Sequence, residues 1–304
     1  MMVINITNLK NIANEFGCTF AENASMKDYT TFKTGGNCPL LISPNSVSAL
    51  REILRECKTS NIPYTVLGNG SNVLVSDDGI NGIVIHIADA LNKITLLDET
   101  TIFCEAGVKL GTLCNFALEN SLTGLEFAFG IPGSVGGAVF MNAGAYGDEM
   151  KDVVTKVYHV DNDGNEGLIS GDNLAFGYRT SAYERNGYIV TGVELKLTKG
   201  NKDDIKTKMA DLLGRRKDKQ PLEYPSAGST FKRPEGYFAG ALIEECNLKG
   251  KQIGGARVSE KHAGFIINYD NATSSDILKL IDFVKETVEK EKGVTLTPEV
   301  RILR

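Results

Sequence analysis

Apolar residues recur at the three- and four-residue spacing of an amphipathic helix in residues 45–57, 109–120 and 273–288. The first stretch begins with Asn and Ser and the last with Thr and Ser, which are residues that commonly cap a helix. The stripe of the last stretch consists of Ile277, Leu280, Ile281, Val284 and Val288. A continuous stripe of this kind predicts a helix that packs against a core.

Short apolar runs bounded by glycine or polar residues predict strands. These runs are residues 64–67, 73–75 and 83–85, and further strands are expected between residues 153 and 197. Within the latter region, Asp161–Gly164 has the composition of a hairpin turn. The pattern as a whole mixes helices and strands.

The chain becomes polar at residues 199–204, and the helix expected after them ends in a charged run at residues 215–219. We therefore expect a domain boundary near Lys199. The length of 304 residues agrees with about two domains.

Composition adds one unusual feature, which is the 32 glycines. Charge is ordinary: 33 basic and 38 acidic residues give a net charge of −5, which argues against a broad nucleic-acid interface. Residues 1–16 lack the apolar core of a signal peptide, and no stretch is long enough to span a membrane. Six scattered cysteines without a CxxC pair predict buried thiols in a reducing cytoplasm, and no metal site.

The first notable glycine segment lies between two predicted strands and consists of Gly68, Asn69, Gly70, Ser71 and Asn72. Successive backbone N–H groups in such a turn can bind an anion. A dinucleotide fingerprint is excluded because Val73 stands in place of the third glycine and no helix is expected next. Taken alone, the segment favours a structural hairpin over a phosphate site.

The second segment is the densest glycine region of the chain, between Gly124 and Gly147. Its candidate ligand-binding residues are Gly133, Ser134, Gly136, Gly137, Asn142 and Gly144. Small side chains would allow a flat or diphosphate-bearing ligand to lie against the backbone, although tight packing between backbone segments explains them equally well. Two such segments together favour a dinucleotide outside the Rossmann class.

These segments belong to a series of ordered blocks that resembles the UDP-N-acetylenolpyruvoylglucosamine reductase family, also called UDP-N-acetylmuramate dehydrogenase or MurB. The other blocks are Phe176-Gly177-Tyr178-Arg179-Thr180-Ser181, Pro225-Ser226-Ala227-Gly228-Ser229-Thr230-Phe231-Lys232 and Pro298-Glu299-Val300-Arg301. The resemblance runs from Tyr29-Thr30-Thr31-Phe32 to the last residues of the sequence, so it covers nearly the whole chain.

The resemblance implies an α+β fold: an FAD-binding domain of the PCMH/vanillyl-alcohol-oxidase type, made of two α+β subdomains, and a C-terminal α+β domain for substrate. The expected division is a helical lead-in over residues 1–28, the FAD domain over 29–198 and the UDP-sugar domain over 199–304. It also implies that NADPH reduces non-covalently bound FAD. The flavin then reduces UDP-N-acetylglucosamine enolpyruvate to UDP-N-acetylmuramate, for peptidoglycan.

Two departures from the family pattern stand out. Some members insert a segment after the arginine block, with a tyrosine that closes over the substrate, whereas residues 178–197 here run on without it. The chain therefore resembles the shorter class, and the group that covers the substrate is open. In addition, Thr297 stands where many relatives have glutamate.

Three residues match the family's catalytic positions. Arg179 carries a permanent charge that suits a carboxylate or enolate, Ser229 matches the proton donor, and Glu299 could orient Arg179 or polarise the substrate. Without the resemblance, an ion pair, a backbone hydrogen bond and a surface position would be the ordinary roles of these three side chains.

Further cations, Lys219, Lys232, Arg233 and Arg301, could contact the diphosphate or carboxylate of the substrate, although a solvated surface position is as plausible for each. The three histidines have no metal-ligand spacing. Two other functions remain open: a flavin oxidase that uses oxygen, and a nucleotide-sugar binding protein without catalysis. The sequence does not indicate the oligomeric state.

Overall fold

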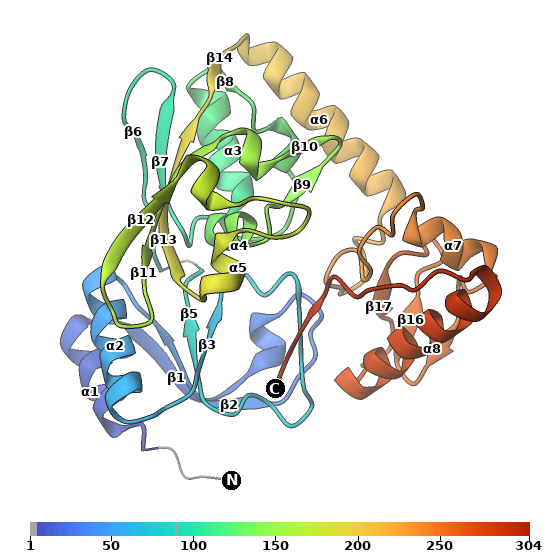
Figure 1. The fold of residues 1–304 in the computed structure, drawn as a ribbon, viewed down its shortest axis with the longest axis horizontal. Helices are drawn as coiled ribbons and strands as arrows, with labels where there is room; N and C mark the ends of the chain where they lie inside the picture. The colour runs from blue at the N-terminus through green and yellow to red at the C-terminus, as the bar shows by residue number, and fades with distance from the viewer. Residues whose placement is uncertain (1–4, 89) are drawn as a thin grey trace. The chain divides into compact units, whose positions relative to one another are not determined.

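The computed structural model describes residues 5–88 and 90–304. The chain forms two compact units (Figure 1). Unit 1 comprises the described residues up to 22, together with 39–69 and 82–215, and unit 2 comprises 23–38, 70–81 and 216–304. The boundary expected near Lys199 differs from this division, in which residues 199–215 belong to unit 1 and two short segments from the first third of the chain belong to unit 2. The first four residues of the expected lead-in lie outside the described residues.

The helices in chain order are α1 (Thr7–Phe16), α2 (Val47–Thr59), α3 (Leu110–Glu119), α4 (Val135–Phe140), α5 (Ala182–Asn186), α6 (Lys202–Lys219), α7 (Ala239–Glu245) and α8 (Ser274–Lys292). Short 3₁₀ turns are η1 (Met26–Tyr29), η2 (Glu126–Ala128), η3 (Met150–Asp152) and η4 (Gly171–Leu174). The three helices expected from the apolar spacing correspond to α2, α3 and α8. Their predictions are confirmed.

The first nine strands are β1 (Thr19–Ser25), β2 (Asn37–Ser43), β3 (Tyr64–Leu67), β4 (Val73–Val75), β5 (Ile83–His86), β6 (Ile94–Leu96), β7 (Thr101–Glu105), β8 (Leu122–Thr123) and β9 (Gly144–Ala145). The remaining strands are β10 (Asp148–Glu149), β11 (Val154–Val160), β12 (Glu166–Ser170), β13 (Ile189–Lys196), β14 (Thr198–Lys199), β15 (Gln252–Ile253), β16 (Ala256–Val258), β17 (Ile266–Asn268) and β18 (Arg301–Leu303). The predicted strands at 64–67, 73–75 and 83–85 are confirmed.

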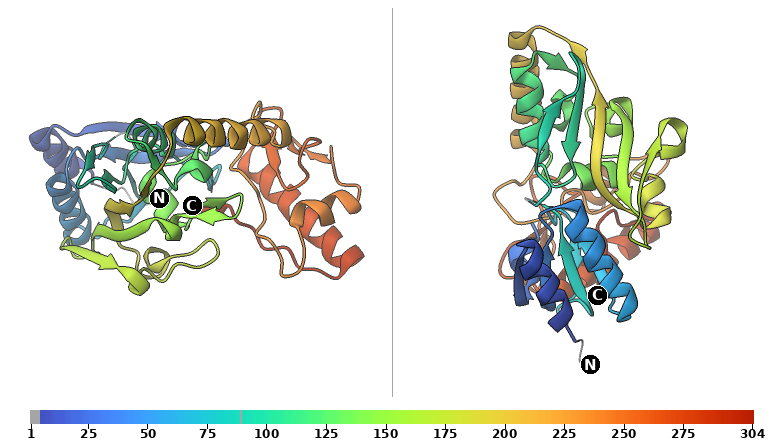
Figure 2. Two further views of the ribbon diagram at one scale, coloured as in Figure 1. Left: turned by 90° about the horizontal axis from the view of Figure 1, so that it is seen from above. Right: turned by 90° about the vertical axis from the view of Figure 1, so that its left-hand side faces the viewer.

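A four-stranded sheet with the order β1-β2-β5-β3 lies mainly in unit 1, although the end of β1 and the start of β2 are assigned to unit 2. Its central strand β5 is parallel to both β2 and β3, and all of Ile83, Val84 and Ile85 are buried. Helices α1 and α2 lie side by side next to this sheet (Figures 1 and 2). Helix α2 is capped by the Ser46 side chain, which accepts a hydrogen bond from the backbone of Ala49.

A five-stranded antiparallel sheet with the order β12-β11-β13-β7-β6 forms the other part of unit 1. Helix α4 contacts β13 and β7. The expected hairpin is confirmed, because β11 and β12 pair in antiparallel register. Between β12 and β13 the chain forms η4 and α5, so the region expected to contain strands is interrupted by two short helical turns.

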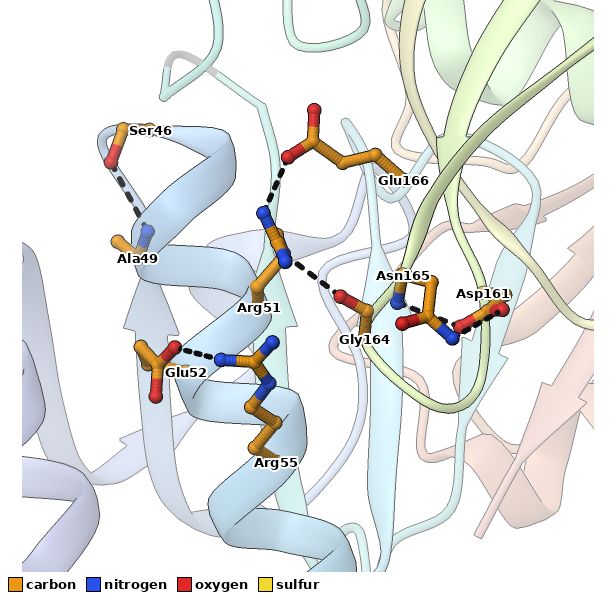
Figure 3. A network of polar contacts seen from close by, with 9 residues as sticks. All are labelled: Ser46, Ala49, Arg51, Glu52, Arg55, Asp161, Gly164, Asn165 and Glu166. Atoms are coloured by element: carbon orange, nitrogen blue, oxygen red, sulfur yellow. Dashed lines mark hydrogen bonds and ion pairs between the residues drawn. The ribbon is translucent and has the colours of Figure 1, made fainter.

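The turn between β11 and β12, which we call the acidic turn (Asp161–Glu166), is tied to helix α2 (Figure 3). Arg51 of α2 donates from Nε to the Gly164 carbonyl at 2.9 Å and from Nη1 to Glu166 Oε1 at 2.6 Å. Asp161 accepts hydrogen bonds from the backbone of Asp163 and Asn165, both at 2.8 Å. The turn is also held by helix α5, because Asn162 Nδ2 donates to the Asn186 carbonyl at 3.2 Å. It is therefore ordered by its own side chains and by two helices.

Unit 2 is built around helix α8, which packs on the antiparallel sheet β15-β16-β17 and contacts α7. Thr273 caps α8 and accepts a hydrogen bond from the Asp276 backbone. All five residues of the predicted apolar stripe are at most 3% exposed, so the prediction of core packing is confirmed. Burial of such side chains contributes about 1.5–3 kcal/mol each.

A second sheet in unit 2 joins distant parts of the chain, because β4 pairs in parallel with β18. The register places Val73 opposite Arg301 and Val75 opposite Leu303. This pairing explains why residues 70–81 belong to the same unit as the end of the sequence.

The six cysteines are all buried, as predicted. Burial raises the pKa of the Cys57 thiol to about 12, with a smaller contribution from the charge of Glu56. Among the described residues, no helix is both long enough and apolar enough to cross a membrane.

Candidate active site

The first glycine segment, residues 68–72, connects strands that belong to different sheets. Strand β3 before it pairs with β5, and strand β4 after it pairs with β18, in both cases in parallel. The expectation of a structural hairpin is therefore wrong. In a hairpin, the two strands on either side of a short turn pair with each other in antiparallel register. Here each strand pairs instead, in parallel, with a strand from another part of the chain.

Gly70 is required by a close approach of two backbone segments within unit 2. Its φ is +61°, and a Cβ built on it would lie 2.0 Å from the Tyr29 carbonyl oxygen. The backbone of Thr31 donates a hydrogen bond to the Gly70 carbonyl at 3.1 Å. Any side chain at this position would displace the segment at residues 29–31.

The two predicted glycine segments meet in unit 1. A Cβ on Gly68 would lie only 2.5 Å from Oγ of Ser134, the residue that caps helix α4. Ser134 is itself buried, and its Oγ accepts a hydrogen bond from the Gly137 backbone at 3.4 Å. The structure thus brings Gly68 together with the second segment, which the sequence alone could not establish.

The glycines of the second segment differ in what surrounds them. A Cβ on Gly136 would lie 2.9 Å from the Cβ of Ala106, and one on Gly144 would lie 2.7 Å from the Cβ of Glu149. These two glycines are explained by packing. Gly137 is exposed, and a Cβ there would meet only Ser134 Oγ, at 3.4 Å. Gly133 has a φ of +150°, which favours glycine.

Asn142 is a fully buried polar residue that organises the end of this segment. Its Nδ2 donates to the Gly177 carbonyl at 2.9 Å and also bonds the Glu149 carboxylate, while its Oδ1 accepts from the Lys151 backbone at 2.9 Å. Asn142 therefore connects the glycine segment to the arginine block of the sequence. Replacing it would leave buried polar groups without partners.

Arg179 lies in a tight turn that we call the arginine turn (Gly177–Thr180). Gly177 and Thr180 exchange backbone hydrogen bonds at 3.1 and 3.3 Å, which leaves Tyr178 and Arg179 at the tip. The φ of Arg179 is +56°, a left-handed conformation that is strained for a residue with a side chain. Its guanidinium lies 5.1 Å from the Tyr178 ring centroid, and Nη2 donates to the Gly144 carbonyl at 3.3 Å. In unit 1 the structure thus brings Arg179 to the glycine segment.

Ser229 and Glu299 come together in unit 2 through the residues beside them. The Glu299 backbone donates to the Thr230 carbonyl at 2.8 Å, and Phe231 bridges to Pro298. Thr230 is buried and is held from the other side, because its backbone donates to the Gly264 carbonyl at 2.8 Å.

Asn72, from the first glycine segment, joins this group. Its Nδ2 donates to the Glu299 carbonyl at 3.2 Å, and its own carbonyl accepts from the Arg301 backbone at 3.0 Å. A candidate cofactor residue and two candidate catalytic residues are thus held by one backbone network in unit 2.

The four candidate substrate cations, Lys219, Lys232, Arg233 and Arg301, all belong to unit 2. The backbone of Lys232 donates to the Thr297 carbonyl at 2.8 Å, which keeps Lys232 next to the Ser229 and Glu299 segments. The Arg233 guanidinium lies 4.5 Å from the centroid of the Phe238 ring. Phe238 was not among the residues singled out by sequence, and its signal was a Tyr-Phe pair that directly follows Gly236.

The histidines serve local structure. His159 Nδ1 lies 3.0 Å from the Tyr183 hydroxyl, and burial lowers the pKa of His159. Burial likewise lowers the pKa of His262, whose Nδ1 accepts a hydrogen bond from the Gly264 backbone at 3.1 Å. Within residues 5–88 and 90–304, no group of three or more His, Cys, Asp or Glu side chains is arranged to hold a metal ion.

Comparison with known proteins places these two groups of residues in a family. A model described as "UDP-N-acetylenolpyruvoylglucosamine reductase, C-terminal domain" matches residues 220–303, and a model described as "FAD binding domain" matches residues 39–166. A UDP-N-acetylenolpyruvoylglucosamine reductase of Clostridium novyi is 51% identical over 281 residues, which are 92% of this chain and 91% of that protein. The chain belongs to the UDP-N-acetylenolpyruvoylglucosamine reductase family.

Other members agree with this assignment. The reductase of Caldanaerobacter subterraneus subsp. tengcongensis is 49% identical over 92% of this chain and 92% of its own. Among solved structures, the MurB reductase of Thermus caldophilus matches with a TM-score of 0.80 and 36% identity, over 94% of this chain and 99% of that one.

The predicted fold class and enzyme class are confirmed. The chain is a flavin-dependent oxidoreductase of the MurB family, with a PCMH-type FAD-binding domain and a MurB C-terminal domain. Its reaction is the reduction of UDP-N-acetylglucosamine enolpyruvate to UDP-N-acetylmuramate in peptidoglycan precursor synthesis, with FAD as cofactor and NADPH as hydride donor. Its substrates are small molecules.

The residues of unit 1 fit an FAD cofactor. Gly137 is exposed at the capped start of α4, and neither Gly137 nor Gly68, which both approach Ser134, places a side chain over the main chain there. Such a surface suits a flat ring or a diphosphate. The matched FAD model covers every cofactor candidate from Gly68 to Gly144, whereas Arg179 lies outside both family models.

Proposed function

We propose that Arg179, Ser229 and Glu299 carry the reduction, and that the two glycine segments hold the flavin. The observation that carries the proposal is the strained tip of the arginine turn. A left-handed arginine persists only where its surroundings fix it, and such strain clusters at functional sites. Here the surroundings are Asn142 and Gly144, two of the cofactor candidates.

FAD is held, without a covalent bond, by the main chain of residues 68–72 and by the segment around α4. The contributing residues are Gly68, Asn69, Gly70, Ser71, Asn72, Gly133, Ser134, Gly136, Gly137, Asn142 and Gly144. When bound, FAD accepts a hydride from NADPH and delivers it to the enolpyruvyl group.

Arg179 stabilises the charge that develops on the substrate. Addition of hydride to the terminal carbon of the enolpyruvyl group moves negative charge toward its carboxylate, as an enolate. A guanidinium presents several N–H donors with a permanent positive charge, so it binds this group more tightly as the charge grows. The hydrogen bond from Nη2 to Gly144 and the Tyr178 ring restrict where the guanidinium can move.

Ser229 donates the proton that completes the reduction at the α-carbon. A serine hydroxyl is a weak acid, and it acts here because the enolate is strongly basic. Ser229 is positioned by Thr230, which is fixed by backbone hydrogen bonds on both sides. Glu299, on the neighbouring segment, polarises the substrate carboxylate or orients the cation that binds it.

The remaining assignments follow from chemistry that is shared with the family. Lys219, Lys232, Arg233 and Arg301 bind the diphosphate or carboxylate of the UDP-sugar. Residues 29–198 serve flavin binding and residues 199–304 serve the UDP-sugar, after a lead-in over residues 1–28. The chain belongs to the shorter class without the tyrosine insertion, and it works in the cytoplasm without nucleic-acid or membrane partners.

The test separates the two half-reactions by stopped-flow absorbance. Ser229→Ala should remain folded and yellow and should be reduced by NADPH at the normal rate, while reoxidation by the enolpyruvyl substrate falls roughly 10²- to 10⁴-fold. Ser229→Thr, which keeps a hydroxyl, is the matched control and should retain more activity.

Three outcomes would contradict the proposal. Equal slowing of both half-reactions in Ser229→Ala would show that Ser229 is not the proton donor. Purified protein that shows no flavin absorbance and binds no added FAD would overturn the cofactor site. Reoxidation by air as fast as by substrate would favour a flavin oxidase.

A further inference from the structure

The loop before helix α7 exposes two aromatic side chains. Phe238 is 63% exposed and Tyr237 is 50% exposed. The two rings are adjacent in the chain, and contiguous exposed apolar surface that is bordered by polar residues marks interaction sites. Here the anchor is Arg233, whose guanidinium lies 4.5 Å from the Phe238 ring centroid.

This loop is connected to the Ser229 segment by contacts within unit 2. A Cβ built on Gly240, two residues after Phe238, would lie 3.4 Å from the Gly264 backbone nitrogen. The Gly264 carbonyl in turn accepts the hydrogen bond from Thr230, the residue after Ser229. The start of helix α7 and the segment that carries Ser229 thus both lie against Gly264.

The charges around the ring suit a nucleotide more than an apolar partner. Lys232 and Arg233 precede the loop, and Glu235 is the acidic side chain within it. An aromatic face with cations beside it combines stacking for a base with attraction for phosphates. The substrate of this family offers that combination, because it joins a uracil base to a diphosphate.

We propose that the Phe238 ring is the face on which the uracil base of the UDP-sugar stacks, with the Arg233 guanidinium supporting the ring. This proposal rests on the proposed function. In family members with the insertion, a tyrosine closes over the substrate, and Phe238 would cover the substrate in this chain, which lacks that tyrosine. Phe238 contributes to binding of the nucleotide and takes no part in hydride or proton transfer.

The composition of the chain provides a direct optical test, because it contains no tryptophan. Phe238→Trp places a single indole at the proposed stacking position of the holoenzyme. Titration with UMP should quench its fluorescence in a saturable manner, whereas AMP and inorganic phosphate should not. Leu168→Trp, at a position in β12 that is 54% exposed, is the matched control and should not respond to UMP.

Affinity provides the second measurement. Phe238→Ala should weaken UMP binding in calorimetry, and raise the KM for the UDP-sugar, by roughly 5- to 150-fold, as for the loss of one stacked base. Phe238→Tyr should keep the wild-type affinity. Reduction of the flavin by NADPH and kcat at saturating substrate should be unchanged in both variants.

Unchanged UMP affinity in Phe238→Ala would overturn the stacking role. Tryptophan fluorescence of Phe238→Trp that does not change when UMP binds would also overturn it. Quenching by AMP or NADP⁺ in place of UMP would assign the ring to the adenine of the hydride donor and would also overturn it. UMP binding requires no chemistry, so these results are independent of whether Ser229 and Arg179 act as proposed.

Discussion

Two turns in unit 1 each contain one residue with a positive φ, but the type of residue at that position differs. In the acidic turn, the residue with a positive φ is Gly164, at +82°, and Arg51 and Asp161 satisfy the surrounding polar groups. In the arginine turn, the residue with a positive φ is Arg179, at +56°. The acidic turn thus follows the sequence rules for stability, whereas the arginine turn violates them and holds a charged group in place.

Under the proposed role of Arg179, the difference marks a position at which function outweighs backbone stability. Each turn requires a positive φ at one position. Glycine adopts this conformation without strain in the acidic turn, whereas Arg179 is strained in the arginine turn. If this interpretation is correct, substitutions at the two positions should have opposite effects on stability and activity.

The largest effect is expected for Arg179→Gly. Loss of the guanidinium should slow flavin reoxidation by the enolpyruvyl substrate by about 10²- to 10³-fold, as for removal of one group that stabilises developing charge. The same change should raise the free energy of unfolding by about 1 kcal/mol, because glycine adopts the left-handed conformation without strain. Stopped-flow absorbance and thermal unfolding of the holoprotein measure the two effects.

Arg179→Lys is the control for that substitution, since it keeps a positive charge and the backbone strain. It should retain part of the activity without the gain in stability. An Arg179→Gly variant that is both active and less stable would contradict the comparison.

The reverse result is expected for Gly164→Val in the acidic turn. A β-branched residue at a φ of +82° should lower the free energy of unfolding by about 1–2 kcal/mol. FAD content and both half-reactions should be unchanged, because the turn is held by hydrogen bonds to helices α2 and α5, neither of which carries a candidate site residue (Figure 3 shows the contacts with α2). Chemical denaturation together with flavin absorbance checks this. Release of flavin from a folded Gly164→Val protein would show that the acidic turn also serves cofactor binding, and would contradict the comparison.

The smallest effect concerns the pH dependence of stability and a histidine next to the acidic turn. His159 of β11 pairs with Gly167 of β12, and burial lowers its pKa. As the pH falls, the unfolded chain therefore takes up a proton at His159 at a higher pH than the folded chain does. Stability should be greatest above about pH 6.5, the usual pKa of histidine, and should fall as the pH drops below it toward the folded pKa.

Thermal unfolding at pH 7.5 and 5.5 measures this dependence. His159→Gln should reduce the difference between the two pH values, and His262, whose pKa is also lowered by burial, should account for part of the remainder. An unchanged pH dependence in His159→Gln would show that His159 does not contribute.

Much of the fold followed from the sequence because the relevant signals are local. The stripe that ends at Val288, the cap at Thr273 and the turn at Gly164 each depend on residues within a few positions of one another. The hairpin expected at Gly68–Asn72 failed for the opposite reason. Whether β3 and β4 pair with each other depends on β5 and β18, and the position of β18 cannot be read from a window around residue 70.

The candidate site shows the same limit. The residue types of Arg179, Ser229 and Glu299 were identified from the family blocks, but their backbone settings were not. The φ of Arg179 and the contact of Gly68 with Ser134 depend on tertiary structure. Phe238 escaped notice because an exposed aromatic residue and a buried one look identical in sequence.

The parallel pair of β4 and β18 has a consequence for synthesis of the protein. The two strands are separated by more than 200 residues, so the segment with Gly70 and Asn72 stays without its partner strand until the ribosome has made β18. Contacts between such distant residues form slowly, because a long loop must close first. If both glycine segments hold the flavin as proposed, stable loading of the cofactor must wait until β18 has been made and has paired with β4.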